Sequence, residues 1–132
     1  MITLDTSAVV ALVNRSDVRH GDAARALGDH GGPTVVPVAI LAEIAHVLNH
    51  RLGSIAMIGF LRGLEQGESL LDCGDADVPR IRELMARFTD PPLGFTDAAV
   101  VACAERNGGH VLTFDRTALE AVARETPVSL VP

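Results

Sequence analysis

Short apolar runs alternate along the chain with longer segments in which hydrophobic residues recur every third or fourth position. The short runs predict five β-strands, over residues 2–4, 34–36, 69–71, 110–114 and 128–131. The longer segments predict helices over residues 8–13, 17–29, 38–51, 55–66, 77–88, 98–106 and 117–123. Because strands and helices alternate, we expect an α/β fold built from βαβ units, with helices on both faces of a parallel sheet.

The same periodicity predicts which helical side chains face the core. For the helices over 38–51, 55–66 and 77–88, these are Ile40, Ile44, Val47, Leu48, Ile58, Leu61, Leu64, Ile81, Leu84, Met85 and Phe88. In the first helix, Thr6 or Ser7 is expected to be the N-terminal cap.

The composition indicates one domain over residues 1–132, since 48% of its 132 residues are hydrophobic and aromatic residues make up only 3%. No stretch approaches the roughly 20 apolar residues that a membrane span needs, and Asp5 comes too early for a signal peptide. We therefore expect a cytoplasmic protein, intact from its first residue and without membrane contact. Cys73 and Cys103 are expected to be free thiols.

The charge pattern excludes several functions. The net charge is −6, and all 11 basic residues other than histidine are arginines. Without a lysine there is no Walker A loop, no Schiff-base cofactor and no receiver-type phosphoacceptor site. An acidic chain also binds polyanions poorly, so contact with nucleic acid would need local arginines or bound cations.

Two acids follow predicted strands directly, and a third opens a helix. Asp5 and Asp115 would meet at one edge of the sheet if their strands are parallel neighbours, where open α/β sheets place their ligands. Asp97 lies in the first turn of its helix, where the helix dipole should keep it ionised. The simpler alternative is that Asp5 and Asp97 only stabilise helix N-termini.

Glu43 is the only charged residue between positions 38 and 45, on a helix that otherwise looks core-facing. A buried carboxylate must be neutralised, reach solvent or find a cation, although a glutamate on the rim of an amphipathic helix needs no such explanation. Four carboxylates gathered at one sheet edge would repel one another. A divalent cation with oxygen ligands, Mg²⁺ or Mn²⁺ rather than Zn²⁺, would relieve that repulsion.

The segments around these acids resemble the four motifs of PIN-domain nucleases, and most closely those of VapC toxins from bacterial toxin–antitoxin pairs. They are residues 4–8, the helix that carries Glu43, residues 95–99 and residues 112–116, in the family's order and spacing over nearly the whole chain. The resemblance implies a PIN-like three-layer sandwich with a central parallel sheet of about five strands, and Mg²⁺- or Mn²⁺-dependent cleavage of RNA. Thr96 departs from the Ala that is frequent in these toxins.

The resemblance also implies roles for single residues. Asp5 and Asp97 would be the principal metal ligands, Glu43 would bind the metal directly or through water, and Asp115 would complete the cluster. Thr6 and Thr113 would be hydrogen-bond donors behind these ligands.

Basic residues near the motifs are candidates for RNA contact. Arg116 follows the last acid, and Arg15 and Arg19 follow the first helix; surface solvation is the alternative for each. His46 and His50 have the spacing of a zinc pair, but the HExxH order is not met, so we expect them on the helix surface or at a partner contact.

Other acidic sites are less consistent with the sequence. An EF-hand loop starting at Asp72 would place Gly74 and Ala76 at ligand positions, which excludes calcium there. A phosphatase with an aspartyl nucleophile would want an acid where Ser7 stands.

Two hypotheses of different class follow. The first is a metal-dependent endoribonuclease toxin that leaves a 5′-phosphate and a 3′-hydroxyl, is neutralised by a cognate VapB-type antitoxin and forms a homodimer. Light scattering would report a monomer if the homodimer is wrong. The second is a catalytically dormant PIN-like module that binds RNA or protein on the same scaffold. A thermal-shift titration with Mn²⁺ separates the two.

Overall fold

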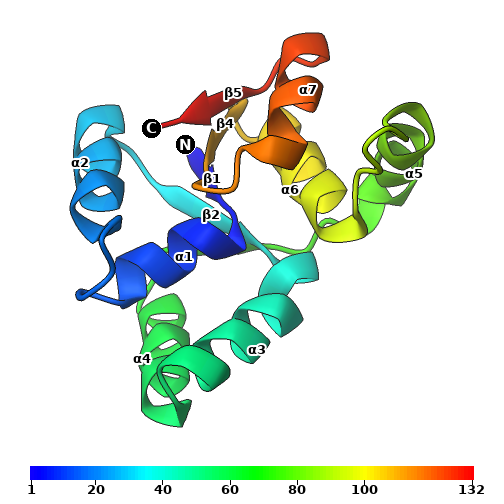
Figure 1. Cartoon of the computed structure of the whole chain (residues 1–132). Helices are drawn as coiled ribbons and strands as arrows, with labels where there is room; N and C mark the ends of the chain where they lie inside the picture. The colour runs from blue at the N-terminus through cyan, green and yellow to red at the C-terminus, as the bar shows by residue number, and fades with distance from the viewer.

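The computed structural model describes residues 1–132 and contains a five-stranded parallel sheet between layers of helices (Figure 1). The strands are β1 (Ile2–Leu4), β2 (Thr34–Pro37), β3 (Leu70–Asp72), β4 (His110–Leu112) and β5 (Ser129–Val131). The helices are α1 (Thr6–Val13), α2 (His20–His30), α3 (Leu41–Arg51), α4 (Ser54–Glu65), α5 (Val78–Arg87), α6 (Phe95–Arg106) and α7 (Thr117–Glu125), with short 3₁₀ turns η1 (Val38–Ile40) and η2 (Asp75–Asp77). The predicted α/β fold with a five-stranded parallel sheet is confirmed. None of the helices has both the length and the apolar character needed to cross a membrane.

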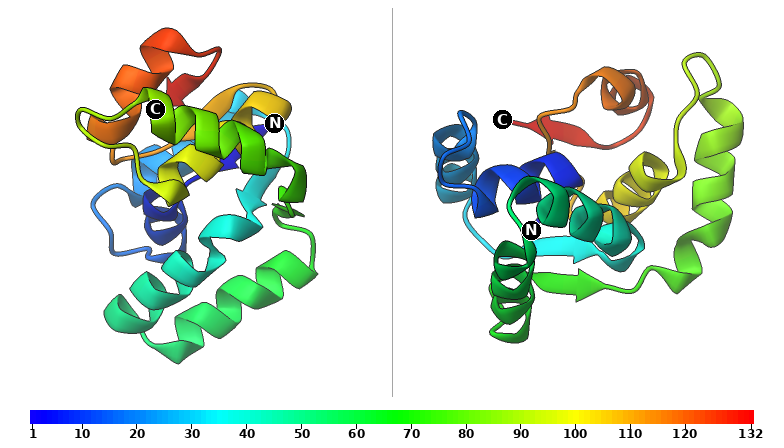
Figure 2. Two further views of the ribbon diagram at one scale, coloured as in Figure 1. Left: turned by 90° about the vertical axis from the view of Figure 1, so that its right-hand side faces the viewer. Right: turned by 60° about the horizontal axis from the view of Figure 1, so that its bottom comes forward.

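The strand order places a ligand crevice at a defined point. The order is β3-β2-β1-β4-β5, so the chain winds outward from β1 to β3 and then returns to the other side of β1. Because parallel crossovers are right-handed, α1 to α4 cover one face of the sheet and α5 to α7 the other (Figures 1 and 2). The order reverses between β1 and β4, and ligands bind outside the carboxyl ends of strands at such a point.

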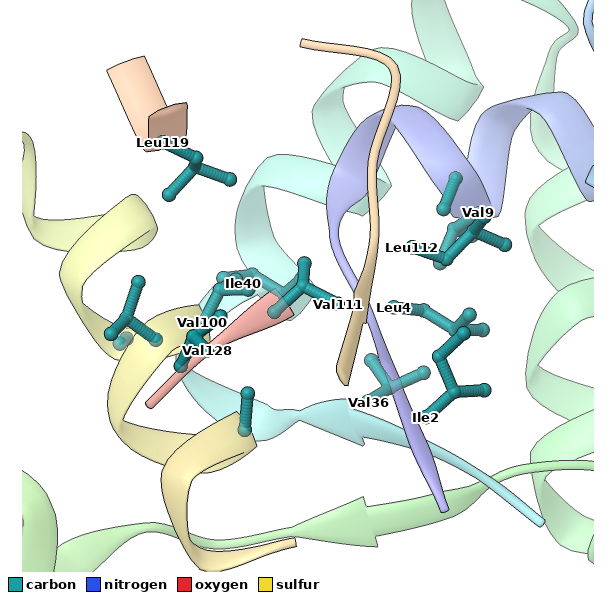
Figure 3. Close-up of a cluster of buried hydrophobic side chains, with 14 of the residues drawn as sticks. Ile2, Leu4, Val9, Val36, Ile40, Val100, Val111, Leu112, Leu119 and Val128 are labelled. Atoms are coloured by element: carbon teal, nitrogen blue, oxygen red, sulfur yellow. The ribbon is translucent and has the colours of Figure 1, made fainter. Parts of the chain in front are cut away.

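The core is one cluster of 26 buried residues on both faces of β1, β2 and β4 (Figure 3). These central strands are apolar on both faces because helices cover both, as expected for a parallel sheet. In α6, seven consecutive residues from Ala98 to Ala104 are buried, and most are Ala or Val. Small side chains let this helix lie close to the sheet, which fixes the position of its first turn at the crevice.

Several predicted core positions are wrong. Ile58 and Leu61 of α4 are 53% and 42% exposed, while Met57 and Phe60 pack against the core instead. Met85 of α5 is 38% exposed. The reason is visible in Figures 1 and 2, where α4 packs beside α3 and α5 beside α6 at the margins of the molecule, so only a narrow stripe of each is covered.

Element boundaries also shift from their predicted places. Helix α2 begins at His20 because the Asn14 and Asp17 side chains accept the backbone N–H groups of Ser16 and Arg19, at 3.1 and 2.8 Å, and hold residues 14–19 in turns. The predicted helix 38–51 starts with the 3₁₀ turn η1. Strand β4 ends at Leu112, two residues earlier than expected.

The acid-rich segment 72–77 has a structural explanation. Arg106 of α6 donates to both carboxylate oxygens of Asp77, at 2.6 Å each, and to Asp72 at 2.7 and 3.0 Å. The guanidinium lowers the pKa of Asp72 below its ordinary value. This network ties the edge strand β3 and η2 to α6, so these acids stabilise the fold.

Candidate active site

A cavity of about 330 Å³ opens at the carboxyl edge of β1 and β4. Five carboxyl groups line it, those of Asp5, Asp17, Glu43, Asp97 and Asp115. Asp5 follows β1, which pairs in parallel with β4, and β4 ends three residues before Asp115. The condition under which Asp5 and Asp115 would meet, that their strands are parallel neighbours, is therefore fulfilled. Glu43 comes from α3 and Asp97 from the first turn of α6, so four separate segments bring acids to one cavity.

Asp5 is buried, with 6% of its surface exposed, and its carboxylate accepts three hydrogen bonds. Oδ1 accepts the backbone N–H of Ala8 at 2.8 Å and the Ser7 hydroxyl at 2.7 Å, and Oδ2 accepts the Thr113 hydroxyl. Asp5 itself is thus the N-terminal cap of α1, and the prediction of Thr6 or Ser7 as the cap is wrong. Burial raises the pKa of Asp5 above its ordinary value, and the hydrogen bonds oppose this rise only in part.

Two hydroxyl groups link Asp5 to the segment that follows β4 and carries Asp115. Ser7 donates to Asp5 and accepts the backbone N–H of Phe114 at 2.8 Å. Thr113 is completely buried, donates to Asp5, and accepts the backbone N–H of Asp115 at 3.1 Å. The role of Ser7 in linking Asp5 to the segment after β4 could not be predicted from the sequence, because its partner Phe114 lies 107 positions away.

The pKa of Asp97 is strongly raised by its surroundings. Burial, and then the charges of Asp115, Asp5 and Glu43, raise its pKa from 3.8 to about 6. The helix dipole was expected to favour the ionised form of Asp97, whereas burial and like charge act in the opposite direction and raise its pKa. The other three motif acids all contribute to the raised pKa of Asp97.

Glu43 and Asp115 are exposed at the cavity, and Thr6 lines it beside them. Glu43 thus reaches solvent, one of the three outcomes that its position allowed. Val47 and Arg51 line the same cavity from the following turns of α3. One face of α3 therefore forms a wall of the site.

The oxygen-bearing side chains that line the cavity suit a hard divalent cation. Its groups are carboxylates and hydroxyls, the oxygen ligands that Mg²⁺ and Mn²⁺ prefer, and a cation would relieve the repulsion that raises the pKa of Asp97. No three His, Cys, Asp or Glu side chains converge closely enough to hold a metal by themselves. Mg²⁺ does not need such a group, because it keeps several waters and is usually bound through one or two protein carboxylates.

Of the three basic candidates Arg15, Arg19 and Arg116, only Arg19 lines the acidic cavity. Arg116 donates to the Pro132 carbonyl at 3.0 Å and pairs with Glu120, and Arg15 lines an apolar groove elsewhere. The arginines that line the acidic cavity are Arg19 and Arg51. The His46 and His50 rings lie 4.2 Å apart on the exposed side of α3, outside the cavity lining.

Comparison with known proteins agrees with this arrangement. The family model described as PIN domain matches residues 2–125. The chain is 28% identical to Ribonuclease VapC26 of Mycobacterium tuberculosis over 121 residues, which is 90% of each protein. VapC20 of Mycobacterium tuberculosis, a sarcin–ricin loop cleaving toxin, has a crystal structure that matches with a TM-score of 0.79 at 26% identity, over 92% of this chain and 95% of that one.

FitAcB from Neisseria gonorrhoeae shares the fold, with a TM-score of 0.67 at 17% identity over 100% of this chain and 97% of that one. The resemblance to VapC proteins that the motifs indicated is confirmed by these relatives. With a family match over residues 2–125 and the motif acids around one cavity, the chain belongs to the PIN domain family.

Proposed function

We propose that this protein is a divalent-metal-dependent endoribonuclease, the toxin of a VapBC-type pair acting in the cytoplasm, with a single nuclease domain over residues 1–132. The observation that carries the proposal is the meeting of Asp5, Glu43, Asp97 and Asp115 at one cavity, with a pKa of about 6 at Asp97. Like charges held together in this way favour a cation, and perturbed carboxylates in a cleft are typical of active sites. The VapC relatives support RNA as the substrate.

In this proposal Asp5 and Asp97 would hold Mg²⁺ or Mn²⁺, and Glu43 and Asp115 would complete the site. A bound divalent cation lowers the pKa of a water molecule and offsets the charge of the phosphodiester. Hydrolysis forms a bond between a water oxygen and phosphorus and breaks the bond to the 3′ oxygen, which leaves a 5′-phosphate and a 3′-hydroxyl. Thr113 and Ser7 hold the Asp5 carboxylate in place throughout.

The choice of RNA is the next question for this proposal. VapC20 cleaves the sarcin–ricin loop. An RNA hairpin with that loop is therefore one substrate for a cleavage assay, beside transfer RNA and an unstructured messenger fragment. Mapping the cut ends would test the predicted 5′-phosphate.

Addition of Mn²⁺ is expected to stabilise the protein. At ten times the dissociation constant, one bound ion raises the free energy of unfolding by about 1.4 kcal/mol. Differential scanning fluorimetry at pH 7.5, with Mn²⁺ titrated to millimolar concentration against EDTA, measures this shift. No stabilisation would favour the dormant binding module, which is supported by the absence of three His, Cys, Asp or Glu side chains grouped closely enough to hold a metal.

The proposed antitoxin partner has a suitable surface outside the acidic cavity. A groove of about 730 Å³ runs between α1, α2 and α4, lined by apolar residues that include Leu12, Leu27 and Phe60. An amphipathic segment of the antitoxin would lie in such a groove, with its tail reaching the acids. We propose that this groove binds the VapB-type antitoxin.

Gly59→Glu is expected to release the toxin from its antitoxin without loss of RNA cleavage. Gly59 lines the groove, and a Cβ added there meets no atom within 4 Å, so a side chain can begin at this position without displacing the core. Replacing a helical glycine also favours the folded state by up to about 1 kcal/mol. The measurement is growth arrest with and without co-expression of the cognate VapB-type antitoxin, with Gly59→Ala as the control. Full neutralisation of Gly59→Glu would contradict this placement.

The homodimer stays a prediction. Ile55, Ile58 and Leu61 of α4 are 85%, 53% and 42% exposed, and such a patch supports association with a second copy.

A further inference from the structure

The two arginines at the acidic cavity have no carboxylate partner. Ion pairs within 4.0 Å involve five arginines, Arg25, Arg80, Arg87, Arg106 and Arg116. Arg19 and Arg51 are absent from these pairs although five carboxyl groups line the same cavity. Their guanidinium groups are exposed, so their donors remain available to an anion that enters from solvent.

Arg19 is held at the β4 side of the cavity. Its backbone N–H donates to Asp17 Oδ1 at 2.8 Å, and its guanidinium lies over the Phe114 ring, 5.5 Å from the centroid. Phe114 directly precedes Asp115, and its own N–H donates to Ser7. Arg19 and Phe114 therefore form a stacked cationic and aromatic surface next to two of the acids.

Arg51 lies at the other end of the α3 wall. Glu43, Val47 and Arg51 follow one another at intervals of four residues, so all three line the cavity from one helix face. Eight residues of helix separate Arg51 from Glu43 by about 12 Å. A charge at the end of α3 also suits the helix dipole, but that explains neither its place in the cavity lining nor its lack of an ion pair.

We propose that Arg19 and Arg51 bind backbone phosphates of a single-stranded RNA segment on either side of the scissile bond, with Arg19 held in place by its stacking on Phe114. This inference rests on the proposed ribonuclease function. A chain with a net charge of −6 repels RNA, so phosphate contacts beyond those of a bound cation need local arginines, and the unpaired arginines at the acids are in position to supply them. A cavity of about 330 Å³ suits a small ligand or a single strand rather than a duplex.

The test measures RNA binding and its salt dependence. Fluorescence anisotropy with a labelled unstructured RNA oligonucleotide is recorded from 50 to 300 mM salt, on full-length protein carrying Asp97→Asn so that the RNA is not consumed. Added to this background, Arg19→Gln and Arg51→Gln are each expected to weaken binding about tenfold and to lower the salt slope by about 0.7. The double variant is expected to lower the slope by about 1.4.

Controls separate phosphate binding from a structural role. Arg62→Gln removes an exposed, unpaired arginine of α4 outside the cavity, and affinity and slope are expected to stay within twofold of the parent. Arg51→Lys is expected to recover most of the slope, because the charge remains. The inference is overturned if Arg19→Gln and Arg51→Gln behave like Arg62→Gln while the wild-type protein cleaves RNA. If wild-type protein neither binds nor cleaves RNA with Mn²⁺, the proposed function fails and this inference fails with it.

Discussion

Asp97→Asn is expected to abolish RNA cleavage, by about a thousandfold or more, and to make the metal-free protein more stable at pH 8. The loss of activity follows from removing one carboxylate of the proposed metal site, whose electrostatic contribution is large in a partly buried cavity. The gain in stability follows from removing a charge that burial and three neighbouring acids disfavour. An active-site residue that lowers stability in this way is a sign of function.

The contribution of Asp97 to the free energy of unfolding is expected to fall as the pH rises. The pKa of Asp97 is 3.8 in a model peptide and about 6 in the folded protein, so between these values the folded state binds more protons than the unfolded state. The contribution of this group to the free energy of unfolding is therefore fully present below about pH 4 and is lost as the pH rises through 6. Because Asp97 is partly exposed, we expect a loss of about 1 to 2 kcal/mol.

Urea unfolding at pH 5 and pH 8 in EDTA measures this difference for wild type and Asp97→Asn. Mn²⁺ should reverse the pH trend of the wild type by favouring the ionised carboxylate, and it should affect the variant little. Asp75→Asn, an exposed acid outside the cavity, is the control for a change of net charge. Cleavage retained by purified Asp97→Asn, at more than a tenth of the wild-type rate, would contradict the assignment.

The convergence of the acids was predictable because it depends on a rule of topology. Asp5 and Asp115 follow apolar runs, and parallel neighbouring strands end at the same edge, so local sequence was enough to place them together. The backbone N–H of Phe114 donates to Ser7, and the Thr113 hydroxyl donates to Asp5, each across more than 100 positions. The family resemblance implied Thr113 as a donor, but no local pattern predicts the contact between Ser7 and Phe114, which depends on how the chain packs.

The positions of most arginines relative to the acids could not be predicted from the sequence either. Arg15 and Arg116 stand near motif acids in sequence, yet one lies at the apolar groove and the other binds the chain's last residue. Arg51 is eight positions from Glu43 and reaches the cavity only because α3 runs along it. Helical periodicity likewise placed one face of α4 inward, but it cannot say that the neighbour is α3 rather than the sheet, which is why Ile58 is exposed.

Asp5→Ala is expected to abolish cleavage as completely as Asp97→Asn, and also to lower the free energy of unfolding by about 2 to 3 kcal/mol. The first effect removes a proposed metal ligand. The second arises because Asp5 caps α1, a contribution of about 0.5 to 2 kcal/mol, and because its loss removes the carboxylate that accepts from the buried Thr113 hydroxyl and the half-buried Ser7 hydroxyl. Capping and metal binding, which from the sequence were alternatives for Asp5, are compatible in the structure.

Asp5→Asn separates the two effects. The amide oxygen can still accept from Ala8 and Ser7, and Thr113 can turn its hydroxyl toward the Asp115 carbonyl, 3.3 Å away. The amide also removes the buried charge whose pKa is raised by burial, so we expect a stability within about 1 kcal/mol of wild type. Urea unfolding at pH 7 and a cleavage assay on the same preparations measure both effects. If Asp5→Ala and Asp5→Asn were equally stable, the cap would contribute nothing, and Asp5 would be held at the sheet edge for its charge alone.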